Sequence, residues 1–269
     1  MTILIITFLL TGLLSGFLAG LLGVGGGIII VPVSYYVLLK LGYSVNVVMH
    51  VSVASSLAVI VFTSISSIRS HLKLGNIEKK VIKKWFIGIV IGSLLGSFLA
   101  SEVKGEILVL IFISLAFLIS INMFFQKKIK TIQNDIPNSF ILNFFISSSI
   151  GFLSALIGIG GGSFSVPTLS IFSKKIHQAV GTSSVLGFFI AFPATISYIF
   201  LGVDNENLPP YSLGYVNVLI VFLVTFTSIF TANIGAKISS KIDKDNLKRI
   251  FAIFLLFTCI SLVIEHFII

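Results

Sequence analysis

Two glycine clusters lie within strongly apolar sequence and could together bind an anion. Consecutive glycines stop a helix and leave N–H and C=O groups without helical partners. Where a helix resumes after such a break, its free N–H groups and the positive end of its dipole face the break, which favours an anion. In both clusters the pattern is Gly-x-Gly-Gly-Gly, followed five residues later by Pro. The consecutive glycines are Gly25, Gly26 and Gly27 in the first cluster and Gly160, Gly161 and Gly162 in the second.

Hydroxyl side chains follow each cluster and could donate hydrogen bonds to the same anion. They are Ser55 and Ser56 after the first cluster and Thr182, Ser183 and Ser184 after the second. The sequence therefore predicts one site that combines these hydroxyls with the six glycines. Two simpler interpretations stay open. The glycines could serve close helix packing, and each hydroxyl could donate to the carbonyl four residues earlier in its own helix.

The composition is typical of a polytopic membrane protein. Hydrophobic residues make up 56% of the 269 residues and charged residues only 10%, which is too little charge for the surface of a soluble domain. A membrane-spanning helix needs about 20 apolar residues. Eight such spans are predicted, at 2–22, 45–68, 78–101, 105–125, 138–157, 178–201, 212–236 and 250–268. We expect an all-α fold in the cell (inner) membrane, with two further short or broken helices after the glycine clusters, at 26–41 and 162–173.

Ionisable side chains are scarce inside the predicted spans. All nine Asp and Glu lie at span ends or between spans, so no buried carboxylate is predicted to couple proton or sodium movement. His50 could titrate within the membrane and shuttle a proton, although packing near the end of its span is the simpler interpretation. We expect neither a metal nor a cofactor.

The chain contains an internal repeat. Three matches define it: Gly16–Pro32 with Gly151–Pro167 at a spacing of 135, Ser55-Ser56 with Ser183-Ser184 at 128, and Leu74-Gly75 with Leu213-Gly214 at 139. The differences between these spacings fall in predicted loops. The sequence therefore predicts a first transmembrane repeat over 1–126, a cytoplasmic linker over 127–137 and a second transmembrane repeat over 138–269.

The basic residues indicate how the two repeats are oriented. Of the 18 Lys and Arg, all except Lys40 and Lys104 lie in four breaks between apolar segments. If each glycine cluster marks a point where the chain turns back, all four breaks lie on the cytoplasmic side. The repeats then have inverted topology, an arrangement in which substrates bind at the midplane. Because orientation explains the net charge of +9, we expect no nucleic-acid partner.

Three features together resemble the TauE/SafE family of sulfite exporters and four-toluene-sulfonate-uptake permeases. They are the doubled glycine motif, Gly181-Thr182-Ser183-Ser184 after a basic loop, and His71-Leu-Lys-Leu-Gly75-Asn76-Ile77 after a predicted span. The resemblance covers nearly the whole chain. It implies an inner-membrane permease for a small sulfur-containing anion such as sulfite or a sulfonate. The first repeat has Val53-Ala54-Ser55-Ser56 where the family often has Gly-Thr-Ser, so the two halves of the site could contribute unequally.

Two other functions stay open beside the permease, for which no enzyme activity is expected. An intramembrane serine hydrolase is one, because Gly181–Ser184 is similar to the serine motif of rhomboid proteases. That chemistry needs a histidine within hydrogen-bond reach of the serine, and the later spans offer one only at the extreme end of the chain. A membrane assembly or signalling component without transport is the other. The expected partners are a small anion and the lipid bilayer, and the sequence leaves open whether the chain forms a homo-oligomer.

Overall fold

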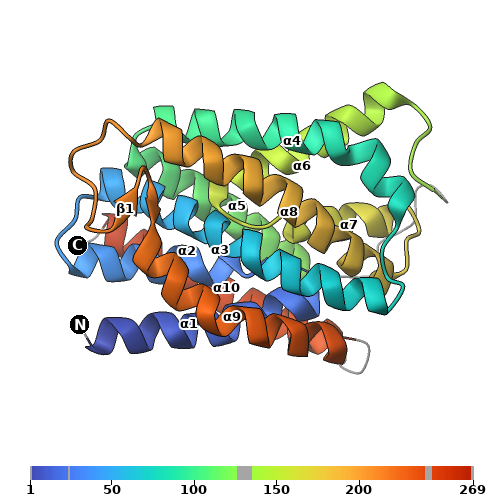
Figure 1. Cartoon of the computed structure of the whole chain (residues 1–269), viewed down its shortest axis with the longest axis horizontal. Coiled ribbons are helices and arrows are strands. Elements are labelled where there is room, and N and C mark those ends of the chain that lie inside the picture. The colour runs from blue at the N-terminus through green and yellow to red at the C-terminus, as the bar shows by residue number, and fades with distance from the viewer. Residues whose placement is uncertain (1, 24, 126–134, 240–243, 268–269) are drawn as a thin grey trace.

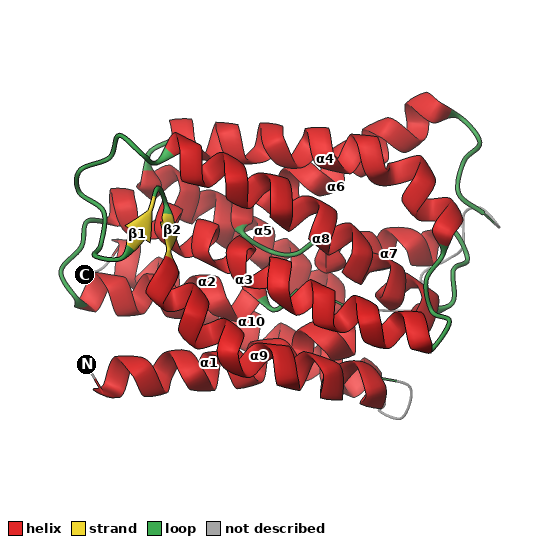
Figure 2. Cartoon of the chain, in the orientation of Figure 1, coloured by secondary structure: helices red, strands yellow, loops and turns green. Residues whose placement is uncertain are grey.

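Helices make up most of the described chain, with one short β-hairpin at one end (Figures 1 and 2). The computed structural model describes residues 2–23, 25–125, 135–239 and 244–267, and in the last helix only the side chains of 249 and 252–265. The helices are α1 (Thr2–Leu22), α2 (Gly27–Lys40), α3 (Val45–Lys73), α4 (Lys79–Glu102), α5 (Gly105–Phe124), α6 (Phe140–Ile157), α7 (Gly162–Ile171), α8 (Ile176–Leu201), α9 (Val218–Ile238) and α10 (Lys244–Phe267). The antiparallel strands are β1 (Ser212–Leu213) and β2 (Val216–Asn217).

Seven helices among the described residues are long and apolar enough to cross a bilayer: α1, α3, α4, α5, α6, α8 and α9. They identify a helical integral membrane protein, as the sequence predicts. The eighth predicted span coincides with α10, whose side chains are described over only part of its length, so the count of eight stays a prediction. With 14 and 10 residues, α2 and α7 extend about 21 Å and 15 Å. Neither can cross a hydrocarbon core of about 30 Å alone.

The chain between α8 and α9 differs from the prediction. The sequence predicts a helix over 212–236, but the first part of this segment forms the β-hairpin. Tyr211 and Gly214 have φ angles of 65° and 53°, which no right-handed helix accommodates. The Asn217 side chain then accepts a hydrogen bond from the Ile220 N–H (3.1 Å) and caps the start of α9. Turn and cap residues therefore set this boundary, which apolar composition alone does not reveal.

The two halves of the chain exchange outer helices, in the sense that an outer helix of each half packs against a helix of the other half. The first helix, α1, packs along α9, and α4 packs along α6 (Figure 1). A Cβ on any glycine in these contacts would overlap the facing helix, so the missing side chains let the helix backbones approach closely. These glycines recur every four residues and are Gly12, Gly16 and Gly20 in α1 and Gly88, Gly92 and Gly96 in α4.

The centre of the bundle is formed by α3 and α8, which pack against each other. The short helix α2 packs against α3, and α7 packs against α8. Both loops that join an outer helix to a short helix lie inside the bundle, away from its two ends (Figure 2). From its loop, α2 returns to the end at which α1 begins, and α7 returns to the end at which α6 begins (Figure 1).

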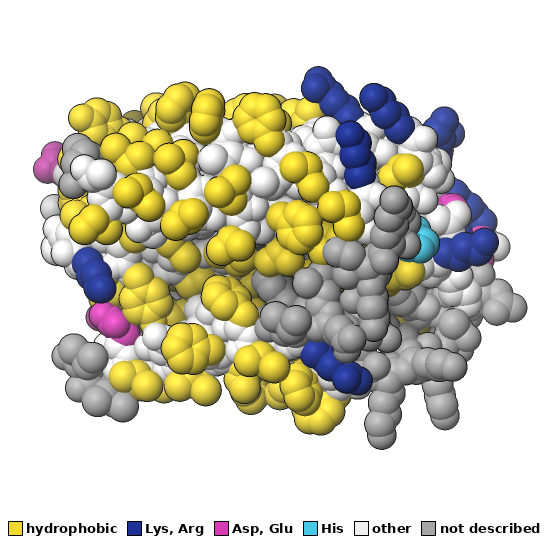
Figure 3. Space-filling view, turned by 90° about the horizontal axis from the view of Figure 1, so that it is seen from below, with side chains coloured by type: hydrophobic (Ala, Val, Ile, Leu, Met, Phe, Trp, Pro, Cys, Tyr) yellow, Lys and Arg dark blue, Asp and Glu magenta, His cyan; other side chains and the backbone are white. Residues whose placement is uncertain are grey.

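The two ends of the bundle differ in charge. On the face drawn in Figure 3, the Lys and Arg side chains gather mainly toward one end. By the order of the helices, Lys40 at the end of α2 and Lys104 just before α5 lie toward the opposite end. At the basic end, Asp135 pairs with Lys80 and with the Lys174 Nζ (3.0 Å). Hydrogen bonds from Lys80 and then Lys174 hold the pKa of the Asp135 carboxyl well below its usual range. This distribution agrees with a cytoplasmic position for the basic end.

Candidate functional site

The two glycine clusters meet inside the bundle. The first cluster joins α1 to α2, and the second joins α6 to α7. Gly25 and Gly160 approach so closely that a Cβ on Gly25 would lie 2.8 Å from the Gly160 Cα. A Cβ on Gly27 would overlap the carbonyl oxygen of Gly158. The structure therefore brings together two clusters that are far apart in the sequence, as one shared site requires.

Backbone conformation explains why glycines stand at this contact. Gly25 and Gly26 have φ angles of 81° and 75°, and Gly158 has 71°. Residues with a Cβ rarely adopt such angles. The outer helices α1 and α6 therefore stop here, and α2 and α7 begin. The first N–H groups and the positive dipole ends of both short helices lie at the contact.

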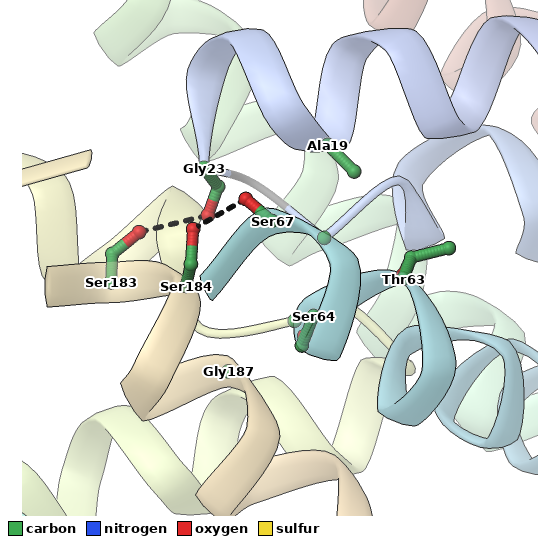
Figure 4. A pocket seen from close by; sticks show the side chains of 10 residues that line it. Ala19, Gly23, Thr63, Ser64, Ser67, Ser183, Ser184 and Gly187 are labelled. Atoms are coloured by element: carbon green, nitrogen blue, oxygen red, sulfur yellow. Dashed lines mark hydrogen bonds between the residues drawn. The ribbon is translucent and has the colours of Figure 1, made fainter. Parts of the chain in front are cut away.

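Each central helix holds the loop of the other half through a serine. The Ser56 hydroxyl of α3 donates to the Gly158 carbonyl (2.8 Å). In the same way, the Ser183 hydroxyl of α8 donates to the Gly23 carbonyl (2.8 Å; Figure 4). Both serines are fully buried. These two hydrogen bonds connect the half-sites reciprocally, because each one crosses from one half of the chain to the other.

A second pair of equivalent hydrogen bonds involves the residues just before these serines. The Ser55 hydroxyl accepts from the backbone N–H of Asn217, which caps α9, and the Thr182 hydroxyl accepts from the N–H of Glu78, just before α4 (both 2.9 Å). Ser55 therefore corresponds to Thr182 in the structure, at a spacing of 127 residues. This pairing by hydrogen bonds differs by one residue from the spacing of 128 predicted from Ser-Ser identity, since it matches a Ser hydroxyl with a Thr hydroxyl.

A cavity of about 10 Å³, the size of roughly one water molecule, lies beside the loop contact (Figure 4). Of the predicted site residues, Gly25, Gly160, Ser183 and Ser184 line it. The remaining glycines and hydroxyls of the predicted site do not line it. They are Gly26, Gly27, Ser55, Ser56, Gly161, Gly162 and Thr182.

The cavity also has lining residues that the predicted site did not include. They are Ala19, Gly23, Thr63, Ser64, Ser67 and Gly187. The Ser67 and Ser184 hydroxyls lie 2.9 Å apart and connect α3 to α8 (Figure 4). Thr63 and Ser67 lie about two and three helical turns beyond Ser56 on the same helix. This spacing of hydroxyls along an otherwise apolar helix could have identified them.

Comparison with known proteins places the chain in a family. Residues 8–262 match the family model described as sulfite exporter TauE/SafE. The chain belongs to the TauE/SafE family. No solved structure matches this family member significantly.

Curated relatives align with this TauE/SafE member over most of their length. A Haemophilus influenzae protein named probable membrane transporter protein is 34% identical over 263 residues, covering 97% of this chain and 98% of the relative. The probable membrane transporter protein YunE of Bacillus subtilis is 28% identical over 265 residues, with 91% and 92% covered. A probable membrane transporter protein of Methanocaldococcus jannaschii is 29% identical over 231 residues, with 85% and 84% covered.

The chemistry available at the cavity is that of neutral hydrogen-bonding groups. Among the described residues that line it, the only polar side chains are the hydroxyls of Ser and Thr. Such hydroxyls can donate to an oxyanion but supply no general base for a nucleophilic serine. Within the described part of the chain, no group of three or more His, Cys, Asp or Glu is placed to hold a metal.

His50 lies away from this cavity. It precedes Thr63 on α3 by 13 residues, which corresponds to about 20 Å along the helix. Its Nδ1 lies 2.7 Å from the Asn46 carbonyl oxygen, and its Nε2 lies 2.9 Å from that of Ala100 at the end of α4. The imidazole also stacks on Tyr215, with ring centroids 5.0 Å apart. These contacts fasten the start of α3 to α4 and the hairpin, and the proton-coupling role stays a prediction.

Proposed function

We propose that this TauE/SafE protein is a permease that carries a small sulfur-containing anion, such as sulfite or a sulfonate, across the cell (inner) membrane. The names of the relatives support transport, and the family description supports a sulfur oxyanion. The observation that carries the proposal is the contact between two glycine loops inside the bundle. Non-helical backbone at membrane depth is tolerated where it is buried in protein or lines a polar cavity, and broken helices often form transporter substrate sites.

An anion between the two loops would meet the start of α2 and the start of α7. Both helix ends offer N–H groups and a positive dipole end. The Ser56 and Ser183 hydroxyls, which donate to glycine carbonyls in the described form, would turn toward the anion. A cavity of about 10 Å³ is too small for sulfite, so the loops or the central helices must separate when the anion binds.

An inverted pair of repeats would allow this site to open to either side. In this proposal the repeats extend over 1–126 and 138–269, although the boundary at 126 and most of the linker 127–137 lie outside the described residues. Three observations support it: the exchanged outer helices, the reciprocal serine hydrogen bonds, and the opposite directions in which α2 and α7 return to the surface. One half could then move against the other around a fixed site.

Flux and binding measurements on the purified full-length protein test the proposal. In proteoliposomes we expect uptake of radiolabelled sulfite or taurine above that of protein-free vesicles. A thermal-shift screen should show a higher Tm with sulfite, thiosulfate, taurine or isethionate, because a ligand that binds only the folded state stabilises it. Acetate serves as the control anion without sulfur. Equal shifts with acetate would contradict selectivity for sulfur anions, and the absence of flux for every anion would contradict the permease.

A further inference from the structure

A groove of about 730 Å³ lies between α3 and α9, toward the basic end of the bundle. It is separate from the central cavity, and no residue lines both. Two hydrogen bonds fix its shape by joining the helices. The Ser66 hydroxyl donates to the Ile229 carbonyl, and the Ser70 hydroxyl donates to the Asn233 Oδ1 (both 2.8 Å). These two hydrogen bonds therefore hold the walls of the groove in fixed positions.

Three cations line the groove: Arg69 and Lys73 from α3, and Lys237 from α9. All three side chains are exposed. Among the described residues, none of the three forms an ion pair with a carboxylate. The positive charge in the groove is thus not balanced by described acidic groups, and it suits a negatively charged ligand.

The rest of the groove is largely apolar and accessible from the hydrocarbon. Phe62, Phe230 and Ile234 line it and are 45%, 65% and 49% exposed. A small inorganic anion would gain nothing from these side chains. A ligand with both an anionic head and hydrocarbon chains would contact the cations and the apolar wall at the same time.

The matching positions in the other half of the chain are apolar. At the spacing of 127 residues given by the hydroxyl pairs, Arg69 corresponds to Ile196 and Lys73 corresponds to Phe200. Two of the three cations of the groove therefore have no charged counterpart at these positions of the other half. The groove lies toward the basic, cytoplasmic end, where the leaflet carries anionic lipid and attracts Lys and Arg near its surface.

We propose that this groove binds an anionic phospholipid of the cytoplasmic leaflet. The phosphate group lies among Arg69, Lys73 and Lys237, and an acyl chain lies along Phe62 and Phe230. The bound lipid bridges α3 and α9, which come from opposite halves of the chain.

Lipid binding to the purified full-length protein tests this inference. Phosphatidylglycerol and phosphatidylcholine with identical acyl chains are added, and the retained lipids are counted by native mass spectrometry while Tm is followed. Phosphatidylglycerol should be retained and should raise Tm more than phosphatidylcholine. The variant Arg69→Gln, Lys73→Gln, Lys237→Gln should lose this preference, because each basic residue near the surface contributes roughly fivefold to anionic-lipid affinity.

The matched control variant is Lys79→Gln, Lys83→Gln, Lys175→Gln, which removes the same charge from exposed positions at the same end. It should keep the preference for phosphatidylglycerol. Equal losses in both triple variants would overturn the site and leave only a general surface charge effect. A response to glycerol 3-phosphate as large as that to phosphatidylglycerol would overturn the lipid in favour of a soluble phosphate. If the triple variant does not fold, Lys73→Gln alone should show a reduced preference, and an unchanged one would contradict the site.

Discussion

Single hydroxyl groups position the loops of the candidate site. Ser56 and Ser183 each donate to a carbonyl of the opposite half. Both glycine carbonyls are non-helical and deeply placed, where a lost partner is costly. In the proposed permease the same two hydroxyls would turn toward the anion, so their loss should affect both the contact between the loops and anion binding.

We expect Ser56→Ala and Ser183→Ala to lower anion flux by about tenfold or more. Each substitution removes one donor and leaves a buried carbonyl without its partner, a change typically worth about 1–3 kcal/mol. Flux is measured in proteoliposomes and normalised to the amount of reconstituted protein. The control is Ser52→Ala, because this buried hydroxyl on α3 donates to Val48 within its own helix (2.8 Å). Flux reduced equally by Ser52→Ala would contradict a special role for the two crossing hydroxyls.

Gly26→Ala should lower Tm in detergent more than Gly42→Ala does. The two glycines have φ angles of 75° and 88°, so both substitutions carry the cost of left-handed backbone, about 1–2 kcal/mol. A Cβ on Gly26 would also lie 2.7 Å from the Ser15 carbonyl oxygen, whereas nothing lies within 4 Å of one on Gly42. Equal changes in Tm would show that the left-handed backbone alone explains the need for glycine at position 26, without the close contact to Ser15.

Ion pairs join the turns at the basic end of the bundle. Asp135, just before α6, pairs with Lys80 of α4 and with Lys174 in the α7–α8 turn. Lys174 also approaches Glu78 in the α3–α4 turn (Nζ–Oε2 3.8 Å), and Gln178 of α8 donates to the same carboxylate (2.7 Å). This network connects turns from both halves of the chain.

Asp135→Asn should lower the free energy of unfolding at neutral pH by less than about 1 kcal/mol, since the pairs are partly exposed and screened. The pKa of Asp135 is lowered in the folded protein by Lys80 and then Lys174. Its contribution is therefore fully present above the usual carboxyl pKa and is lost as pH falls through the lowered value. The Tm difference between wild type and variant, measured from pH 7 downward, should hold until acidic pH and then shrink. A Tm difference that grows on acidification would contradict this pairing. The control is Asp204→Asn, in a loop at the other end of the bundle.

Apolar length predicts most helices correctly, because a bilayer requires about 20 apolar residues for each span. It does not predict the β-hairpin, since Tyr211, Gly214 and Asn217 set that boundary through turn and cap geometry. The glycine clusters identify the two helix breaks, because consecutive glycines stop a helix wherever they occur. Sequence cannot give the partners of Ser56 and Ser183, which lie 102 and 160 residues away. Only the fold decides that these hydroxyls meet glycine carbonyls and that Ser67 meets Ser184.

The distribution of charge between the two ends of the bundle predicts which end faces the cytoplasm. Cys259 is the only cysteine and is buried, so a Cys259→Ser background permits single-cysteine labelling. In intact cells, a membrane-impermeant maleimide should label Asp204→Cys in the α8–α9 loop. It should label Lys175→Cys in the α7–α8 turn only after lysis. The reverse pattern would contradict the orientation given by the basic residues.

The exchange of outer helices between the halves has a consequence for biosynthesis. The glycine face of α1 reaches its partner α9 only after most of the polypeptide has entered the membrane. Until then its narrow surface of bare backbone must be covered by lipid or by the insertion machinery. Neither half can complete its packing alone, because an outer helix of each half packs against a helix of the other half. The nascent chain can therefore complete its helix packing only late in synthesis, after α9 has been inserted and packs against α1.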